Sequence, residues 1–190
     1  YARQGSGSAA RSIYGGFVEW KKGSSHQDSY AVPIDDAQWD IGIVIVMVNS
    51  MEKLISSREG MKRTVDTSPF YKVWVESAEE DLKHIKIAIR NRDFKKTGLI
   101  AERNGLKMHA IMLGANPPFC YWEPDSLKVM QIVRQLRREG IYCYFTLDAG
   151  PNVKILCRLS ESHKIKDRLI QFFDPDQVII AKPGPGITIL

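Results

Sequence analysis

The chain has 190 residues, of which 44% are apolar and 26% charged, and its formal net charge is +5. This length suits one or two domains with a buried core. A membrane span is excluded, because no apolar run approaches the roughly 20 residues that a span needs. No secretory leader opens the chain, and the three cysteines are too far apart for a disulfide framework or a CxxC metal site, so we expect a cytoplasmic protein.

The glycine- and serine-rich stretch Gly5–Ser8 allows two interpretations. Such runs are typical of flexible linkers. Alternatively, glycine N–H groups, serine hydroxyls and the start of a following helix could bind an anion, with Arg11 supplying a planar fork for a carboxylate or phosphate. The spacing of these residues does not decide between the two.

The first third of the chain predicts a helix over residues 8–14, a strand over 17–20 and a polar loop over 21–29. The continuous β-branched run from Ile41 to Val48 predicts a central strand buried on both faces. A polar stretch follows over residues 49–67.

Ser68 followed by Pro69 is typical of a capped helix start. The helix that it begins carries a rough apolar stripe: Phe70, Val73, Ser77, Leu82, Ile85 and Ile89. Asp93 is expected to cap a second helix, which the Pro117–Pro118 pair ends.

A third helix is expected over residues 125–139, with Gly140 as its stop. The residues predicted to face inward are Leu127, Met130, Val133 and Leu136. The apolar period then changes to two, which predicts strands over 142–148 and 153–159 joined by a turn. Ser160 is expected to cap a helix that carries Ile165, Leu169, Phe172 and Phe173, and residues 178–181 and 186–190 to form short strands. The pattern indicates an α+β fold, an antiparallel sheet with helices packed on one side.

Three positions outside the opening turn could carry chemistry. Asp148 ends a predicted strand at a Gly-Pro turn, so it either forms that turn or acts as a rigid general base. Ser57 and Arg58 follow a buried strand and are either plain loop surface or a phosphate clamp. His109 lies on an apolar helix and is interpreted as a core histidine with its hydrogen bonds satisfied. We find no metal cluster and no GxxxxGK(S/T) or GxGxxG motif.

The positive charge points to an anionic partner. The basic residues between Lys83 and Lys96 alternate with acidic ones, as on a solvated helix face, and the aromatic residues do not interleave with them as a nucleic-acid platform requires. A small phosphorylated ligand explains the excess equally well.

Four motifs in order along the chain resemble the diphosphomevalonate decarboxylase family of the GHMP kinase superfamily, in its bacterial, Gram-positive form. They are ARQGSGSAARSIYGGFVEW, SSREGM, ERNGLKMHA and YFTLDAGPNVKIL. One departure is Ala10, where the family usually has cysteine. The resemblance favours the anion-binding turn over the linker.

The resemblance implies a GHMP-kinase-like C-terminal domain over residues 51–190, preceded by the tail end of the N-terminal domain over residues 1–50. Family members are longer and carry a nucleotide loop before the opening motif. We therefore expect this chain to be a C-terminal portion that is inactive alone.

The resemblance also implies the reaction, which is ATP-dependent decarboxylation of mevalonate diphosphate to isopentenyl diphosphate. Asp148 and Arg11 would be catalytic, and Ser6, Ser8, Ser57 and Arg58 would bind the substrate. Mg²⁺ would accompany ATP, bound chiefly through phosphates rather than by protein ligands. We expect no nucleic acid or membrane as a partner, and a homodimer is left open.

Two alternatives remain. A mevalonate-type kinase of the same superfamily would phosphorylate without decarboxylation, although the presence of both Asp148 and Arg11 argues against it. A basic α+β nucleic-acid-binding module would bind oligonucleotides with a steep salt dependence.

Overall fold

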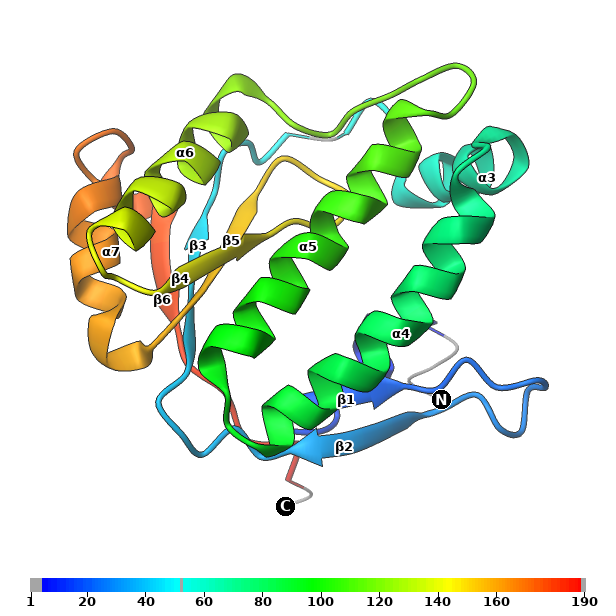
Figure 1. Cartoon of the computed structure of the whole chain (residues 1–190), viewed down its shortest axis with the longest axis horizontal. Coiled ribbons are helices and arrows are strands. Elements are labelled where there is room, and N and C mark those ends of the chain that lie inside the picture. Colours follow the sequence, from blue (N-terminus) through cyan, green and yellow to red (C-terminus); the bar gives the residue numbers. More distant parts are fainter. Residues whose placement is uncertain (1–4, 52, 189–190) are drawn as a thin grey trace.

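The computed structural model describes residues 5–51 and 53–188, which form two antiparallel sheets (Figure 1). The smaller sheet pairs β1 (Phe17–Trp20) with β2 (Ala31–Asp35), a strand that the sequence did not predict. The larger has the order β4-β5-β3-β6 and consists of β3 (Gly42–Val46), β4 (Cys143–Thr146), β5 (Val153–Cys157) and β6 (Val178–Ala181). The predicted α+β class is confirmed.

The helices are α2 (Gly7–Arg11), α3 (Ser57–Thr67), α4 (Tyr71–Arg90), α5 (Phe94–Leu113), α6 (Pro124–Arg138) and α7 (Ser162–Leu169), with 3₁₀ turns η1 (Leu159–Glu161) and η2 (Pro175–Gln177). Helix α2 precedes the first strand and contacts the smaller sheet, as α4 does, whereas α5, α6 and α7 contact the larger sheet (Figure 1). The long helices α4 and α5 lie side by side.

The main core lies between the larger sheet and helices α6 and α7. Val44 pairs with Ile155 and Val46 with Val153, and all four side chains are fully buried. The alternate residues face the other side of the sheet, where Ile43 is exposed and Ile45 half-buried. The prediction of a central strand is confirmed, but its burial on both faces is wrong, because α6 and α7 cover one face only.

Helix α5 packs along the edge strand β4, and a glycine sets how closely. A Cβ atom on Gly98 would lie 2.0 Å from Cδ2 of Tyr144, so a larger residue there would push the helix away from the strand. The rings of Phe94 and Tyr144 meet beside it, with centroids 5.8 Å apart. Asp93 caps α5 by accepting a hydrogen bond from Lys96 N, as predicted.

The polar stretch after β3 contains the helix α3, which the sequence did not predict. Ser56 caps it, since its hydroxyl accepts a hydrogen bond from Glu59 N at 3.2 Å. Ser68 is the residue after α3 rather than the cap of the next helix, which begins at Tyr71. The predicted role of Ser68 is therefore wrong.

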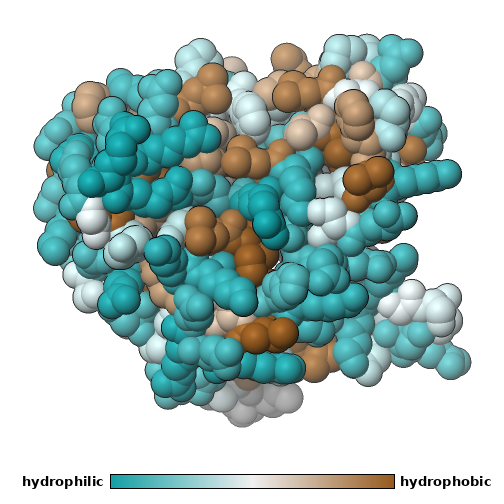
Figure 2. All heavy atoms as spheres, in the orientation of Figure 1, coloured by the Kyte–Doolittle hydropathy of each residue, from teal (hydrophilic) through white to brown (hydrophobic). Residues whose placement is uncertain are grey.

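The predicted apolar stripe of α4 is wrong at three positions. Phe70, Val73 and Leu82 are 57%, 67% and 37% exposed, while Ile89 is buried. Helix α4 instead contacts α5 partly through the buried carboxylate of Asp81, which forms ion pairs with Arg103 and Lys107. Figure 2 accordingly shows separate apolar patches on a largely hydrophilic face, where α4 and α5 lie at the front.

Two other side chains predicted to face inward, Leu127 and Phe172, are exposed. The remaining predicted core positions on α6 and α7 are buried: Met130, Val133, Leu136, Ile165 and Leu169. Gly140 has a φ of +90° just after α6, which confirms the predicted stop.

Ser160 lies in η1 and does not cap α7, because its hydroxyl donates to Asp40 Oδ2 at 2.6 Å. No strand forms over residues 186–188, and residues 189–190 of that predicted strand lie outside the described residues, as do residues 1–4 of the opening motif. Instead, Ile187 N donates to Ile13 O at 3.0 Å, so the last described segment lies against the first.

The predicted boundary at residue 50 stays a prediction. Strand β3, which that boundary assigns to the first part, is hydrogen-bonded on both sides to β5 and β6 of the second part. The smaller sheet β1–β2 lies wholly before the boundary.

Candidate functional site

The opening turn presents two of its predicted site residues together. Helix α2 begins at Gly7, and the Ser6 hydroxyl caps it by accepting from Ala9 N at 2.9 Å. Ser8 Oγ accepts from Nη2 of Arg11 at 3.3 Å. The helix ends at Arg11 rather than at residue 14. Ser6 therefore supports the turn, whereas Ser8 orients the arginine fork.

Asp148 follows β4 at the corner of the β4–β5 hairpin. Its Oδ1 accepts from Nζ of Lys154 at 2.6 Å, and its side chain is 76% exposed. No described residue bonds to its Oδ2. Its own carbonyl accepts from Gly150 N at 2.8 Å, which closes the turn. The carboxylate is thus both turned toward solvent and held at one oxygen.

The corner is tied to the core from its other side. The hydroxyl of Ser126, which is fully buried at the start of α6, donates to Pro151 O at 2.7 Å and accepts from Glu123 N at 3.1 Å. Asn152 Oδ1 accepts from Asn49 N at 3.0 Å. These bonds fix the corner relative to α6 and the end of β3.

An open cleft of about 800 Å³ lies between the opening turn and strand β5. Ser8, Arg11, Ser12 and Lys154 line it. Asp148 does not line this cleft, but it pairs with Lys154, so the lysine links the corner to the cleft that Arg11 lines. Lys154 was not predicted as a site residue, although its alternation with the buried Val153 and Ile155 placed it on the open face of the sheet.

A second lysine joins α3 to the corner. Nζ of Lys53 donates to Ser57 Oγ at 3.3 Å and to Ala149 O, next to Asp148. Arg58 is exposed on the first turn of α3. The structure therefore connects Ser57 with the corner, but describes no contact between Arg58 and the cleft. Lys53 stands in a polar stretch with no periodic pattern, so the sequence held no signal for it.

The first turn of α3 rests on two aromatic rings. A Cβ atom on Gly60 would lie 2.5 Å from the Tyr121 hydroxyl and 3.0 Å from the Phe119 ring. The Tyr121 hydroxyl donates to Ser56 O at 3.3 Å, and burial raises the pKa of Tyr121. Gly60 thus lets the start of α3, with Ser57 and Arg58, lie close to the loop before α6.

His109 is buried near the corner, at 1% exposure, as expected of a core histidine. Neither ring nitrogen has a hydrogen bond of standard geometry to a described residue, yet the backbone of Leu147 and Asp148 lies close enough to act on the ring. Its interpretation as a satisfied histidine therefore stays a prediction. Burial lowers the pKa of His109, and the backbone of Leu147 and Asp148 acts in the opposite direction.

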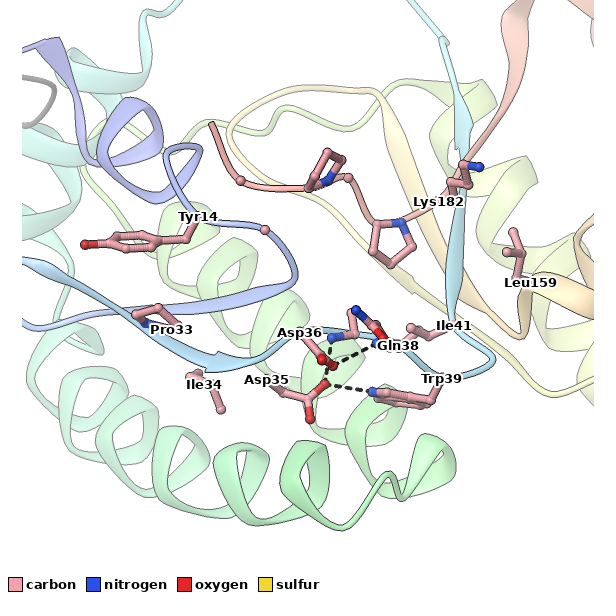
Figure 3. Close-up of a pocket in the computed structure, with 16 residues that line it drawn as sticks. Tyr14, Pro33, Ile34, Asp35, Asp36, Gln38, Trp39, Ile41, Leu159 and Lys182 are labelled. Carbon is pink, nitrogen blue, oxygen red and sulfur yellow. Dashed lines mark hydrogen bonds between the residues drawn. The ribbon is translucent and has the colours of Figure 1, made fainter. Parts of the chain in front are cut away.

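Another cleft, of about 980 Å³, lies between the β2–β3 loop and residues 182–186 (Figure 3). Its carboxylates are occupied within their own loop. Asp35 Oδ1 accepts from Ala37 N and from Trp39 Nε1 at 2.8 and 3.0 Å, and Asp36 Oδ1 accepts from Gln38 N. None of the six predicted site residues lines it, so we assign the candidate site to the cleft at Lys154.

Within the described ranges, no three His, Cys, Asp or Glu side chains are grouped to hold a metal ion. The nearest charged groups to the Asp148 corner are instead the cations Lys154 and Lys53. These residues do not fit a metal held by side chains of this chain. None of the helices described is long and apolar enough to cross a bilayer.

Two family models match the chain. The mevalonate 5-diphosphate decarboxylase C-terminal domain matches residues 43–183, and the diphosphomevalonate decarboxylase-like N-terminal domain matches residues 1–31. A diphosphomevalonate decarboxylase from Ganoderma lucidum is 34% identical over 183 residues, which cover 90% of this chain and 46% of that protein. The chain spans about half the length of the curated relatives it matches.

Solved structures show the same similarity. The mevalonate diphosphate decarboxylase from Enterococcus faecalis, studied for ATP binding mediated by mevalonate diphosphate, is 47% identical with a TM-score of 0.89, covering 97% of this chain and 56% of that one. A structure of MDDEF in complex with MVAPP, AMPPCP and magnesium is 48% identical with a TM-score of 0.91, covering 97% and 57%.

Proposed function

The chain belongs to the mevalonate 5-diphosphate decarboxylase family, and we propose that the protein containing it converts mevalonate diphosphate and ATP to isopentenyl diphosphate, ADP, phosphate and CO₂. The observation that carries this proposal is the cleft lined by Ser8, Arg11 and Lys154, together with the ion pair from that lysine to Asp148, which does not itself line the cleft. The higher identity to the Enterococcus faecalis protein than to the Ganoderma lucidum relative supports the bacterial, Gram-positive type.

In this proposal Asp148 accepts the proton of the substrate's tertiary hydroxyl through Oδ2 as the hydroxyl oxygen attacks the terminal phosphorus of ATP. Lys154 holds the carboxylate in place through Oδ1. After the new phosphate leaves, the electrons of the bond to the carboxylate carbon form the alkene, and CO₂ departs. Arg11, oriented by Ser8, pairs with that carboxylate and a nearby phosphate until it is lost.

Ser57 and Arg58 bind the substrate diphosphate at the first turn of α3, and Ser6 keeps the opening turn in shape. When bound with ATP, Mg²⁺ would neutralise charge on the phosphates, and we expect it to be held chiefly by the phosphates rather than by side chains of this chain. A cytoplasmic location and a homodimer stay predictions.

The test uses the complete enzyme, by which we mean this chain preceded by an N-terminal half such as the longer relatives have. Mixed with mevalonate diphosphate, ATP and Mg²⁺, it should release ADP and CO₂ in equal amounts. ADP release without CO₂ would favour the kinase alternative. Residues 1–190 alone should release neither, since the expected nucleotide loop is missing.

The nucleic-acid alternative has less support. Several basic side chains of the helices are paired with acidic ones at close range: Lys83 with Glu80, Lys86 with Glu19, Arg137 with Glu102, and Arg168 with Glu139. These paired cations would release few counterions on binding phosphates, which weakens the expectation of a steep salt dependence.

A further inference from the structure

His109 is the buried polar side chain that the proposed reaction leaves unexplained. Its ring is 1% exposed, and both nitrogens lack a hydrogen bond to any described residue. The ring packs on Trp122, with centroids 5.1 Å apart, and Trp122 Nε1 is also buried without a partner there. An apolar side chain of similar size would fill this space without leaving polar atoms unpaired, so the imidazole calls for an explanation.

The position of the ring is set by the close approach of α5 to the end of β4. A Cβ atom on Gly105 would lie 3.0 Å from Thr146 Oγ1 and 3.7 Å from Leu147 N. His109 follows Gly105 by four residues and therefore lies on the same face of α5, one turn along. The ring consequently reaches the backbone of Leu147 and Asp148, whose polar groups act on its protonation.

The corner that carries Asp148 is held by side chains at its other residues. Lys53 binds Ala149 O, and Ser126 binds Pro151 O. The backbone at Leu147 and Asp148 lies next to the buried ring of His109 and acts on its protonation.

We propose that His109 is a positioning residue, which holds the backbone of Leu147 and Asp148 from inside the core so that the Asp148 carboxylate meets the substrate hydroxyl. This inference rests on the proposed function, because it acts through Asp148. The ring is neutral, so one N–H can donate toward a backbone carbonyl of the corner. A shift of the carboxylate by about 1 Å is enough to lower kcat roughly 100-fold.

The test compares four variants in the complete enzyme. His109→Leu should lower kcat between about 10- and 100-fold with KM nearly unchanged. His109→Asn or His109→Gln, which keep an amide N–H, should restore much of kcat in at least one case. His84→Leu, a control at an exposed histidine of α4, should leave kcat as it is.

A double variant separates this inference from the proposed function. In an Asp148→Asn background, His109→Leu should lower kcat no further, because both changes remove the same effect. A full additional loss there, an unchanged kcat in His109→Leu, or a kcat that neither amide restores would overturn the positioning role. If Asp148→Asn by itself leaves kcat intact, the proposed function of Asp148 fails instead.

Discussion

The opening turn lines the cleft at Lys154, and the β4–β5 corner is joined to that cleft through the Lys154–Asp148 pair, but the two regions are built in different ways. The turn keeps its shape through bonds among near neighbours, such as Ser6 to Ala9 and Ser8 to Arg11, and its residues are mostly exposed. The corner is held by residues far away in sequence, including Lys53 and Ser126. The comparison teaches that the β4–β5 corner is fixed by long-range contacts with the core. The opening turn instead depends on hydrogen bonds between near neighbours and on whatever packs against it.

The largest effect on kcat is expected at Asp148, the carboxylate of the β4–β5 corner. Asp148→Asn in the complete enzyme should lower kcat by roughly 10²- to 10⁴-fold, the usual scale for losing a general base. KM should change little, and the fold should persist, since the amide keeps the hydrogen-bonding reach of the side chain. Steady-state kinetics with mevalonate diphosphate, together with a circular dichroism melt, measure both. A near-normal kcat would make Asp148 a turn residue only.

A smaller effect, on KM rather than kcat, is expected at Arg58 of α3. Lys53 joins this helix to the β4–β5 corner. Arg58→Ala should raise KM for mevalonate diphosphate by roughly 10- to 150-fold, equivalent to about 1.5–3 kcal/mol for a lost hydrogen bond to a charged group. The same contact exists before and during the reaction, so kcat should stay close to normal. Arg63→Ala on the same helix is the control, because that residue pairs with Glu59 instead. A lower kcat at unchanged KM would contradict the binding role.

Two capping serines compare the stability of the two regions directly. Ser126→Ala should lower the free energy of unfolding by about 1–3 kcal/mol, because Pro151 O and Glu123 N lose their buried partner. Urea denaturation of the complete enzyme measures this loss. An unchanged midpoint would show that the corner is not anchored through Ser126.

The smallest effect on the free energy of unfolding is expected at Ser6, the capping serine of the opening turn. Ser6→Ala removes the cap of the five-residue helix α2, which is exposed and carries one buried residue, Ala10. The free energy of unfolding should fall by about 0.5 kcal/mol, the low end of the cost of losing a helix cap, because α2 is short and exposed. A loss as large as that of Ser126→Ala would mean that both regions are equally tied to the core.

The sequence predicted the corner better than it predicted α3, for a physical reason. Strand β5 alternates buried and half-buried residues, β4 is a short apolar run, and a Gly-Pro turn separates them, so both the hairpin and the place of Asp148 could be predicted from the local sequence. Helix α3 contains few apolar residues and keeps Gly60 and Thr64 buried, so no apolar period marked it. The contact of Lys53 with Ala149 joins residues 96 apart, which no local pattern records.

The prediction of an apolar stripe on α4 was wrong for a related reason. Phe70 and Val73 have the spacing of a buried face, yet α4 is held at Asp81 by ion pairs with α5. Periodicity shows which residues could share a face, but the partner that covers that face is a property of the tertiary structure.

The bond from Ile187 N to Ile13 O gives the chain a mechanical property. It joins two segments that are far apart in sequence, and Gly15 and Gly186 make the approach close, since a Cβ on Gly15 would lie 2.8 Å from Gly186 N. If the chain is pulled at residues 12 and 188, the Ile187–Ile13 hydrogen bond should bear the force first. The hydrogen bonds of β3 with β5 and β6 should bear it only after that bond has broken. A single-molecule pulling trace should therefore show a small early extension, in which the tail peels from the opening turn, before the larger sheet ruptures.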